Sequence, residues 1–114
     1  MYKISSEILG EIDYSPLDVM VKNKYPKSSF DSNEMLNSVF VEDTAYMAIL
    51  DKKPRSRIWL FLFQILNNEW ILSVSKETKR DKEIYRVRRF VPPIDELDKA
   101  TVPYRLIKDF LNEL

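Results

Sequence analysis

Residues 57–76 read RIWLFLFQILNNEWILSVSK, and this stretch decides the fold. Its first ten residues are almost all apolar, whereas its last eight place Trp70, Leu72 and Val74 on one face of a strand and serines on the other. Between them stands the dipeptide Asn67-Asn68, and asparagine tolerates the positive φ values that tight two-residue turns require. The stretch therefore predicts a β-hairpin. A buried helix is the competing interpretation of so short an apolar run.

Outward from this hairpin, two more segments are rich in aromatic and branched residues. They are separated from it by the polar tracts KKPRS and KETKRD, which are typical of turns. Short connections between neighbouring strands favour antiparallel pairing. We therefore predict a four-stranded antiparallel meander with strands at 44–51, 57–66, 69–76 and 82–91.

The second predicted strand is apolar on both faces. One face carries Trp59, Phe61, Phe63 and Ile65, and the other carries Ile58, Leu60 and Leu62. A strand of this kind needs cover on both sides, from helices on each side of the sheet or from a second subunit. The pattern thus raises a homodimer as one expectation.

The N-terminal third has the spacing of short amphipathic helices. One is predicted at 4–12 and a second after Ser15-Pro16, with serine as the N-cap and proline in the first helical position. A third follows Asp31 and Glu34, which form a variant of the capping box.

The C-terminal segment returns to helical spacing from Thr101 onward, with an apolar stripe of Leu106, Ile107, Phe110, Leu111 and Leu114. We interpret it as a helix that closes the core, the alternative being a free amphipathic tail that inserts into a partner's groove. The prediction is a single α+β domain over 1–114, with N-terminal short helices, a four-stranded antiparallel β-meander and a C-terminal amphipathic helix.

Composition excludes more chemistry than it suggests. The 114 residues include no histidine and no cysteine, so histidine or cysteine catalysis and imidazole-ligated metals are impossible. Gly10 is the single glycine, which excludes glycine-rich phosphate loops. We expect a protein that is not an enzyme, with no cofactor and no metal. The chain has no cysteine and no N-terminal pattern of a secretion signal, so we expect a cytoplasmic protein. No apolar run reaches the roughly 20 residues of a membrane-spanning helix.

The chain is small, and its many Lys, Ile, Asn, Tyr and Phe residues are the amino-acid bias that an AT-rich genome produces. Both features suggest a phage-type accessory or inhibitor protein, located in the host cytoplasm if viral.

The formal net charge is zero, but the charges are divided along the chain. From Lys52 to Arg89 there are eleven lysines and arginines against four acids, which gives +7 there and −7 elsewhere. In a meander the first and third turns lie at the same end of the sheet, so their basic tracts should meet. The candidate binding residues are Lys52, Lys53, Arg55, Arg57, Lys76, Lys79, Arg80, Lys82, Arg86 and Arg88.

In the fourth strand, Tyr85, Val87 and Val91 are expected to face the core, which would place Arg86 and Arg88 on the opposite face. We predict that this surface binds an acidic surface of a protein partner, with direct nucleic-acid binding as the alternative. A third interpretation is that acidic helices of the same chain neutralise it.

Two smaller motifs have alternatives of their own. Tyr46, Trp59, Trp70 and Tyr85 could stack on bases, although aromatic residues of alternating strands more often belong to the core. The tripeptide Glu77-Thr78-Lys79 resembles the metal-binding half of restriction-endonuclease-like nucleases, which implies magnesium-dependent cleavage as a remote function. Its position in a polar tract favours a loop of mixed charge instead.

Overall fold

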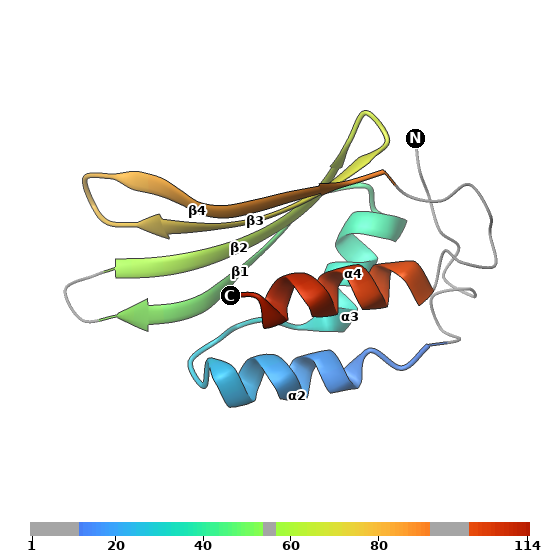
Figure 1. Ribbon diagram of the computed structural model, residues 1–114, viewed down its shortest axis with the longest axis horizontal. Coiled ribbons are helices and arrows are strands. Elements are labelled where there is room, and N and C mark those ends of the chain that lie inside the picture. The colour runs from blue at the N-terminus through green and yellow to red at the C-terminus, as the bar shows by residue number, and fades with distance from the viewer. Residues whose placement is uncertain (1–11, 54–56, 92–100) are drawn as a thin grey trace.

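The computed structural model describes residues 12–53, 57–91 and 101–114, and its main element is a four-stranded antiparallel sheet in the order β1-β2-β3-β4 (Figure 1). This confirms the predicted meander and the α+β class. The first strand lies two residues later than predicted, and the other bounds agree to within one residue. The strands are β1 (Tyr46–Lys53), β2 (Arg57–Leu66), β3 (Glu69–Glu77) and β4 (Lys82–Phe90).

The turn between β2 and β3 forms as the sequence predicts. Asn67 and Asn68 have φ values of 52° and 63°, so both residues adopt the left-handed conformation that matches the twist of a hairpin. The pairs Leu66–Glu69 and Ile65–Trp70 directly flank the turn and fix the register of the two strands.

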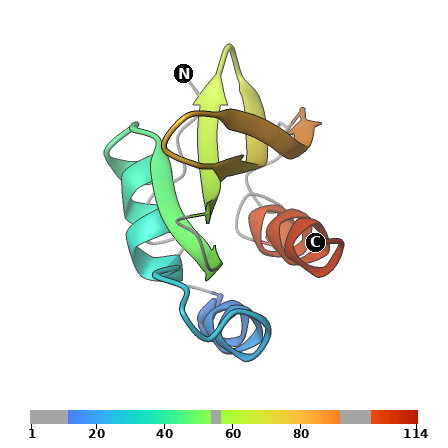
Figure 2. The ribbon, with the colours of Figure 1, turned by 90° about the vertical axis from the view of Figure 1, so that its left-hand side faces the viewer.

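The helices are α2 (Ser15–Lys24), α3 (Ser32–Leu36), the π-helical turn η1 (Asn37–Val41) and α4 (Thr101–Asn112). Figures 1 and 2 show α2, α3 and α4 on the same face of the sheet. Ser15 is the first helical residue rather than the N-cap, because its N–H donates to Asp13 Oδ1 at 2.9 Å while Tyr14 precedes the helix. The helix predicted at 4–12 lies outside the described residues.

The N-cap at Asp31 is confirmed. Its Oδ1 accepts from the N–H groups of Asn33 at 2.9 Å and Glu34 at 3.2 Å, two donors that have no partner within the helix. The same turn is tied to α2, because Asp18 accepts from the N–H of Ser32 at 2.8 Å and from its hydroxyl at 2.5 Å. These contacts fix α3 against α2.

The core lies between the helices and one face of the sheet. Phe40 of η1 makes edge-to-face contacts with Phe63 and Trp70, with ring centroids 5.6 and 5.4 Å apart. Phe110 and Ile107 of α4 are completely buried against this cluster. The C-terminal stripe therefore packs on the chain's own sheet, which confirms that α4 closes the core.

The opposite face of the sheet, which we call the open face, has no described helix over it. Helices on both sides of β2 are therefore not found in the described part of the chain, and Leu60 and Leu62 are only half-buried. In β3, Trp70, Leu72 and Val74 face the core as predicted.

The other side of β3, which carries the serines, is also shielded from solvent in part. Ser75 and Ile71 on that side are nearly buried between their neighbours in the sheet.

The expected orientation of β4 is wrong for Arg86, Arg88 and Val87, whereas Tyr85 lies on the helix side as expected. Arg86 lies opposite Val74 and Arg88 opposite Leu72, so both arginines are on the helix side of the sheet, while Val87 is 49% exposed. The cause is a bulge, because the pairing moves from Val74–Arg86 to Ser75–Ile84 and leaves one residue of β4 unpaired. An extra residue of this kind breaks the simple alternation on which the prediction depended.

Candidate partner-binding site at the basic end of the sheet

The pairing of the strands brings two turns to one end of the sheet. Ile58 lies opposite both Lys52 and Glu77, and Glu77 lies opposite Lys82, so the turn after β1 and the turn after β3 are neighbours. We call this region the basic end. Its described basic residues are Lys52, Arg57, Lys76, Lys79, Arg80 and Lys82.

The remaining predicted site residues do not join them in the described structure. Arg55 lies outside the described residues, and Lys53 ends β1 with a side chain that is not described. Arg86 and Arg88 both bind the Glu113 carboxylate at the end of α4, the first at 3.3 Å. These two arginines are therefore neutralised within the chain, as one of the three sequence interpretations proposed, but by the single acid Glu113 that follows α4 rather than by an acidic helix.

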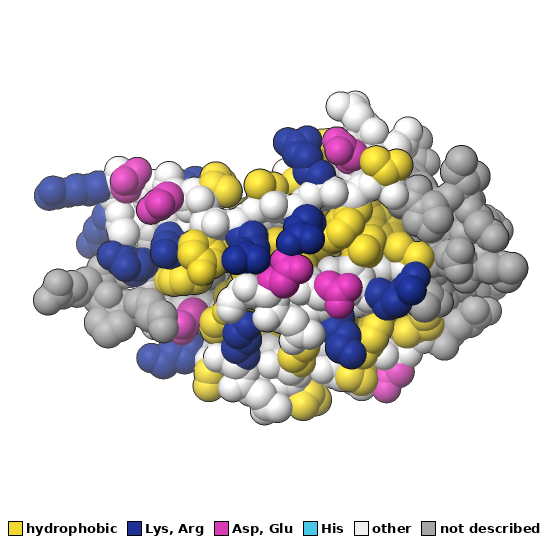
Figure 3. Space-filling view, viewed as in Figure 1, with side chains coloured by type: hydrophobic (Ala, Val, Ile, Leu, Met, Phe, Trp, Pro, Cys, Tyr) yellow, Lys and Arg dark blue, Asp and Glu magenta, His cyan; other side chains and the backbone are white. Residues whose placement is uncertain are grey.

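Four cations at the basic end have no such partner. Lys52, Arg57, Lys79 and Arg80 are exposed, and none forms an ion pair within the described ranges. Lys82 differs, because its Nζ lies 3.4 Å from Glu77 Oε1. Figure 3 shows lysine and arginine side chains at this end of the molecule, with acidic side chains among them.

The turn between β3 and β4 is held by its own hydrogen bonds. The Thr78 N–H donates to the Asp81 carbonyl at 2.9 Å, and the Thr78 hydroxyl accepts from the N–H groups of Arg80 at 3.4 Å and Asp81 at 3.2 Å. A side chain that accepts from the backbone in this way stabilises a turn. Lys79 and Arg80 are therefore presented to solvent by a defined turn.

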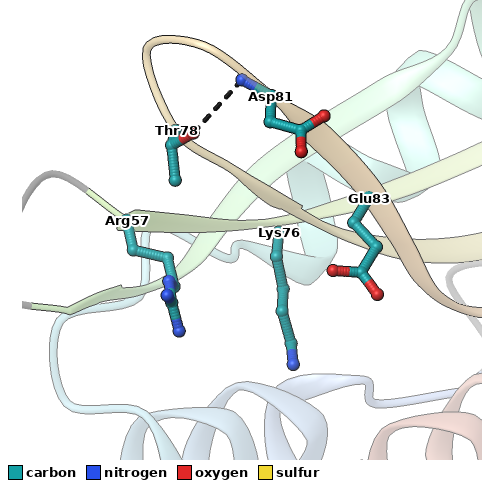
Figure 4. Close-up of a pocket in the computed structure, with 5 residues that line it drawn as sticks. All are labelled: Arg57, Lys76, Thr78, Asp81 and Glu83. Atoms are coloured by element: carbon teal, nitrogen blue, oxygen red, sulfur yellow. Dashed lines mark hydrogen bonds between the residues drawn. The ribbon is translucent and has the colours of Figure 1, made fainter.

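A cavity of about 200 Å³ lies beside this turn and is lined by Arg57, Lys76, Thr78, Asp81 and Glu83. In Figure 4 the side chains of Arg57 and Lys76 extend in the same direction from neighbouring strands, with Glu83 next to Lys76. No acid lies within ion-pair distance of either cation in the described residues. The cavity therefore places two cations, Arg57 and Lys76, beside two acids, Asp81 and Glu83.

Two aromatic rings pack against the ammonium group of Lys76. Its Nζ lies 4.7 Å from the ring centroid of Trp59 and 4.4 Å from that of Tyr85, and the two centroids are 5.0 Å apart. Such contacts stabilise an ammonium group through the negative face of each ring. The Trp59 Nε1–H is buried and has no hydrogen-bond partner among the described residues.

A second cavity of about 150 Å³ continues from these rings and is lined by Tyr25, Asp51, Trp59, Tyr85 and Leu114. Burial raises the pKa of the Tyr25 phenol above its ordinary value, and the nearby Tyr85 and Asp51 raise it further. Sequence reasoning missed Tyr25 and Leu114 because they come from the ends of α2 and α4, and only the tertiary fold brings those ends together. Tyr85 reaches the helix side because it is the unpaired residue of the bulge.

The described residues contain no group of three or more acids that could hold a metal ion. Glu77 is the last residue of β3 and pairs with Lys82, whereas Thr78 and Lys79 lie in the exposed turn, so only part of the tripeptide lies in the loop that the sequence favours.

No described helix has the length and hydropathy needed to cross a bilayer. Comparisons with protein-family models, with curated proteins and with solved structures find no match for this chain.

Proposed function

We propose that this chain is a non-enzymatic interaction protein that binds an acidic surface of another protein through the basic end of its sheet. In this proposal it acts in the cytoplasm as a small accessory or inhibitor protein of phage type, and it works by occluding or bridging its partner. The observation that carries the proposal is the pair of Arg57 and Lys76, which extend side by side into one cavity without an acidic partner among the described residues.

In this proposal, Arg57 and Lys76 bind an acidic side chain of the partner. A partner carboxylate between Arg57 and Lys76 would be held by two cations in a partly enclosed cavity, where electrostatic interactions are stronger than at an open surface. Lys79 and Arg80 on the neighbouring turn would attract an acidic partner at longer range, because exposed cations mainly raise association rates.

A protein partner fits this site better than nucleic acid does. Asp51, Glu77, Asp81 and Glu83 lie among the cations of the basic end, and each would repel a phosphate backbone. A protein surface carries charges of both signs and can present basic groups to these acids. The rings of Trp59 and Tyr85 add an apolar wall, as is common in protein interfaces.

Charge reversal tests the proposal. The double variant Arg57→Glu, Arg80→Glu is compared with Arg105→Glu, Lys108→Glu, which makes the same change in charge on the exposed side of α4. The probes are a fluorescein-labelled peptide rich in aspartate and glutamate and an oligothymidine of equal charge, each titrated at about 50 and about 200 mM salt. We expect the wild type and the α4 variant to bind the peptide more tightly than the oligonucleotide, and the basic-end variant to lose at least about tenfold in peptide affinity.

Affinity purification from the source organism adds a second measurement. A stoichiometric partner should be recovered with the wild type and with the α4 variant but not with the basic-end variant. Tighter binding of oligothymidine, with an affinity that falls steeply with salt, would instead show a nucleic-acid-binding protein. Equal peptide binding by both variants would show that the basic end is not the site.

A further inference from the structure

The open face of the sheet is an apolar surface that no described helix covers. Met47 is 63% exposed and Ile84 is 57% exposed, on the two edge strands, with half-buried leucines of β2 between them. The strand pairing arranges these side chains in two central rows that run across the sheet. One row is Met47, Leu62, Ser73 and Val87, and the next is Ile49, Leu60, Ser75 and Ile84.

The charges of the open face lie at its ends and are largely satisfied. Glu77 pairs with Lys82 at 3.4 Å at one end, and Glu69 pairs with Arg89 at 3.4 Å at the other. The two central rows, all of which lie in the described part of the chain, carry no charged side chain. A nucleic acid or an acidic protein would therefore find no cation at the centre of this face, whereas an equally apolar surface would fit it.

The side chains of the open face form strips of different height along the strands. The serines of β3 leave a low strip between the leucines of β2 and the larger Ile84 and Val87 of β4. Two sheets that pack face to face interdigitate their side chains across about 10 Å. With a two-fold axis across the strands, β2 of one copy lies over β2 of the other, so the leucines of the two copies pack against each other.

The area of the open face is also sufficient. Four strands about 4.8 Å apart, with about nine residues each at about 3.3 Å per residue, give a face of about 570 Å². Two copies would together bury about 1,100 Å², which exceeds the roughly 1,000 Å² expected of a specific interface.

We propose that a second copy of this chain covers the open face and that the protein is a two-fold homodimer joined sheet to sheet. The two-fold axis lies in the interface and across the strands, so that Lys52 and Lys82 of one copy meet the Glu69 end of the other. The alternative axis, along the strands, would place the lysines of both copies together, where they repel. This interface is separate from the basic end and does not depend on its function.

Sedimentation velocity at about 1 to about 200 μM measures the association. We expect the wild type to be dimeric and the double variant Met47→Glu, Ile84→Glu to dissociate at least about 100-fold more easily, because two carboxylates per copy would lose their solvation. Both positions are exposed on edge strands, so circular dichroism should report an unchanged fold. The matched control is Val19→Glu, which introduces the same chemistry at a residue of α2 that is 59% exposed.

Cross-linking provides a test that does not depend on stability. The chain has no cysteine, so Ser73→Cys introduces a single thiol in a central row of the open face. Facing strands about 10 Å apart are too distant for a disulfide, so a short bismaleimide serves as the cross-linker. Thiols held in one dimer have effective concentrations near the millimolar range, so cross-linking at about 10 μM protein should be on the order of 100-fold faster than for Asn23→Cys on the exposed side of α2.

A wild type that is monomeric throughout the concentration range would overturn the proposal. It would also be overturned if the Met47→Glu, Ile84→Glu variant dimerised as well as the wild type, or if both cysteine variants were cross-linked at the same rate. A monomer that becomes dimeric only with a foreign protein bound would assign the open face to that protein instead.

Discussion

At the scale of single residues, Tyr46 joins the apolar core to the polar contacts that position α3. Its ring makes edge-to-face contacts with Phe30 and Phe61, and its hydroxyl accepts from the Asp31 N–H at 2.9 Å. Burial raises the pKa of Tyr46 to about 12, although the hydrogen bond from Asp31 opposes the shift. The folded state therefore favours the neutral phenol more strongly than the unfolded chain does.

This shift predicts a loss of stability in alkali. Because the folded pKa is raised above the ordinary value of about 10, the contribution of Tyr46 is complete below pH 10 and is lost as the pH rises through 12. Tyr46→Phe should cost about 1 kcal/mol at pH 7, since the Asp31 N–H loses its acceptor, but should lose less stability than the wild type between pH 10 and 12. Urea unfolding at several pH values measures both effects, and parallel alkaline losses in the two proteins would contradict the assignment.

The sequence predicts a residue's structural role best where that role involves only neighbouring backbone. Asn67 and Asn68 form the turn, and Asp31 caps α3, because each acts on backbone within three residues of itself. Arg86 and Arg88 were placed on the wrong face because one unpaired residue in β4 changes the alternation, and nothing in the local sequence marks a bulge.

At the scale of elements, α4 is held mainly by apolar packing. Ile107, Phe110 and Leu111 are buried in the core, whereas Glu113 and the two arginines that it binds are each more than a third exposed. Exposed ion pairs contribute at most about 1 kcal/mol, while a buried phenyl ring contributes several times as much. The apolar stripe was visible in the sequence, but its ion pairs depend on where β4 lies relative to α4.

Two substitutions separate these contributions. Glu113→Gln should lower the free energy of unfolding by less than about 1 kcal/mol, and the difference should shrink at about 1 M salt because exposed pairs are screened. Phe110→Ala should cost about 3–5 kcal/mol at any salt concentration, since it leaves a cavity beneath the helix. Chemical denaturation of both variants measures the difference, and equal costs would show that ion pairs hold α4 in place.

At the scale of the whole molecule, the meander places two different surfaces on one sheet. The basic end could be predicted from the positions of the charges along the chain, because a meander brings its first and third turns to the same end of the sheet. The sequence raised Trp59 and Tyr85 only as stacking platforms for bases. Their contact with Lys76 beside Tyr25 and Leu114 was not predicted, because the ends of two helices meet these rings only in the folded chain. The apolar second face of β2 was read from the sequence, but which face the helices cover is decided by the packing of the whole chain.

Together, the two proposed surfaces predict that the protein bridges its partners. In a dimer joined through the open face, with its axis across the strands, the two basic ends point in opposite directions and can hold two acidic partners at once. Wild-type protein should therefore cluster beads coated with the peptide rich in aspartate and glutamate, and light scattering measures this.

The variant Met47→Glu, Ile84→Glu should bind the soluble peptide within about threefold of the wild type but should not cluster the beads, because each monomer has one basic end. The variant Arg57→Glu, Arg80→Glu should remain dimeric and fail in both assays. If the first variant lost binding of soluble peptide, the open face would belong to the peptide site, and the two surfaces could not be separate.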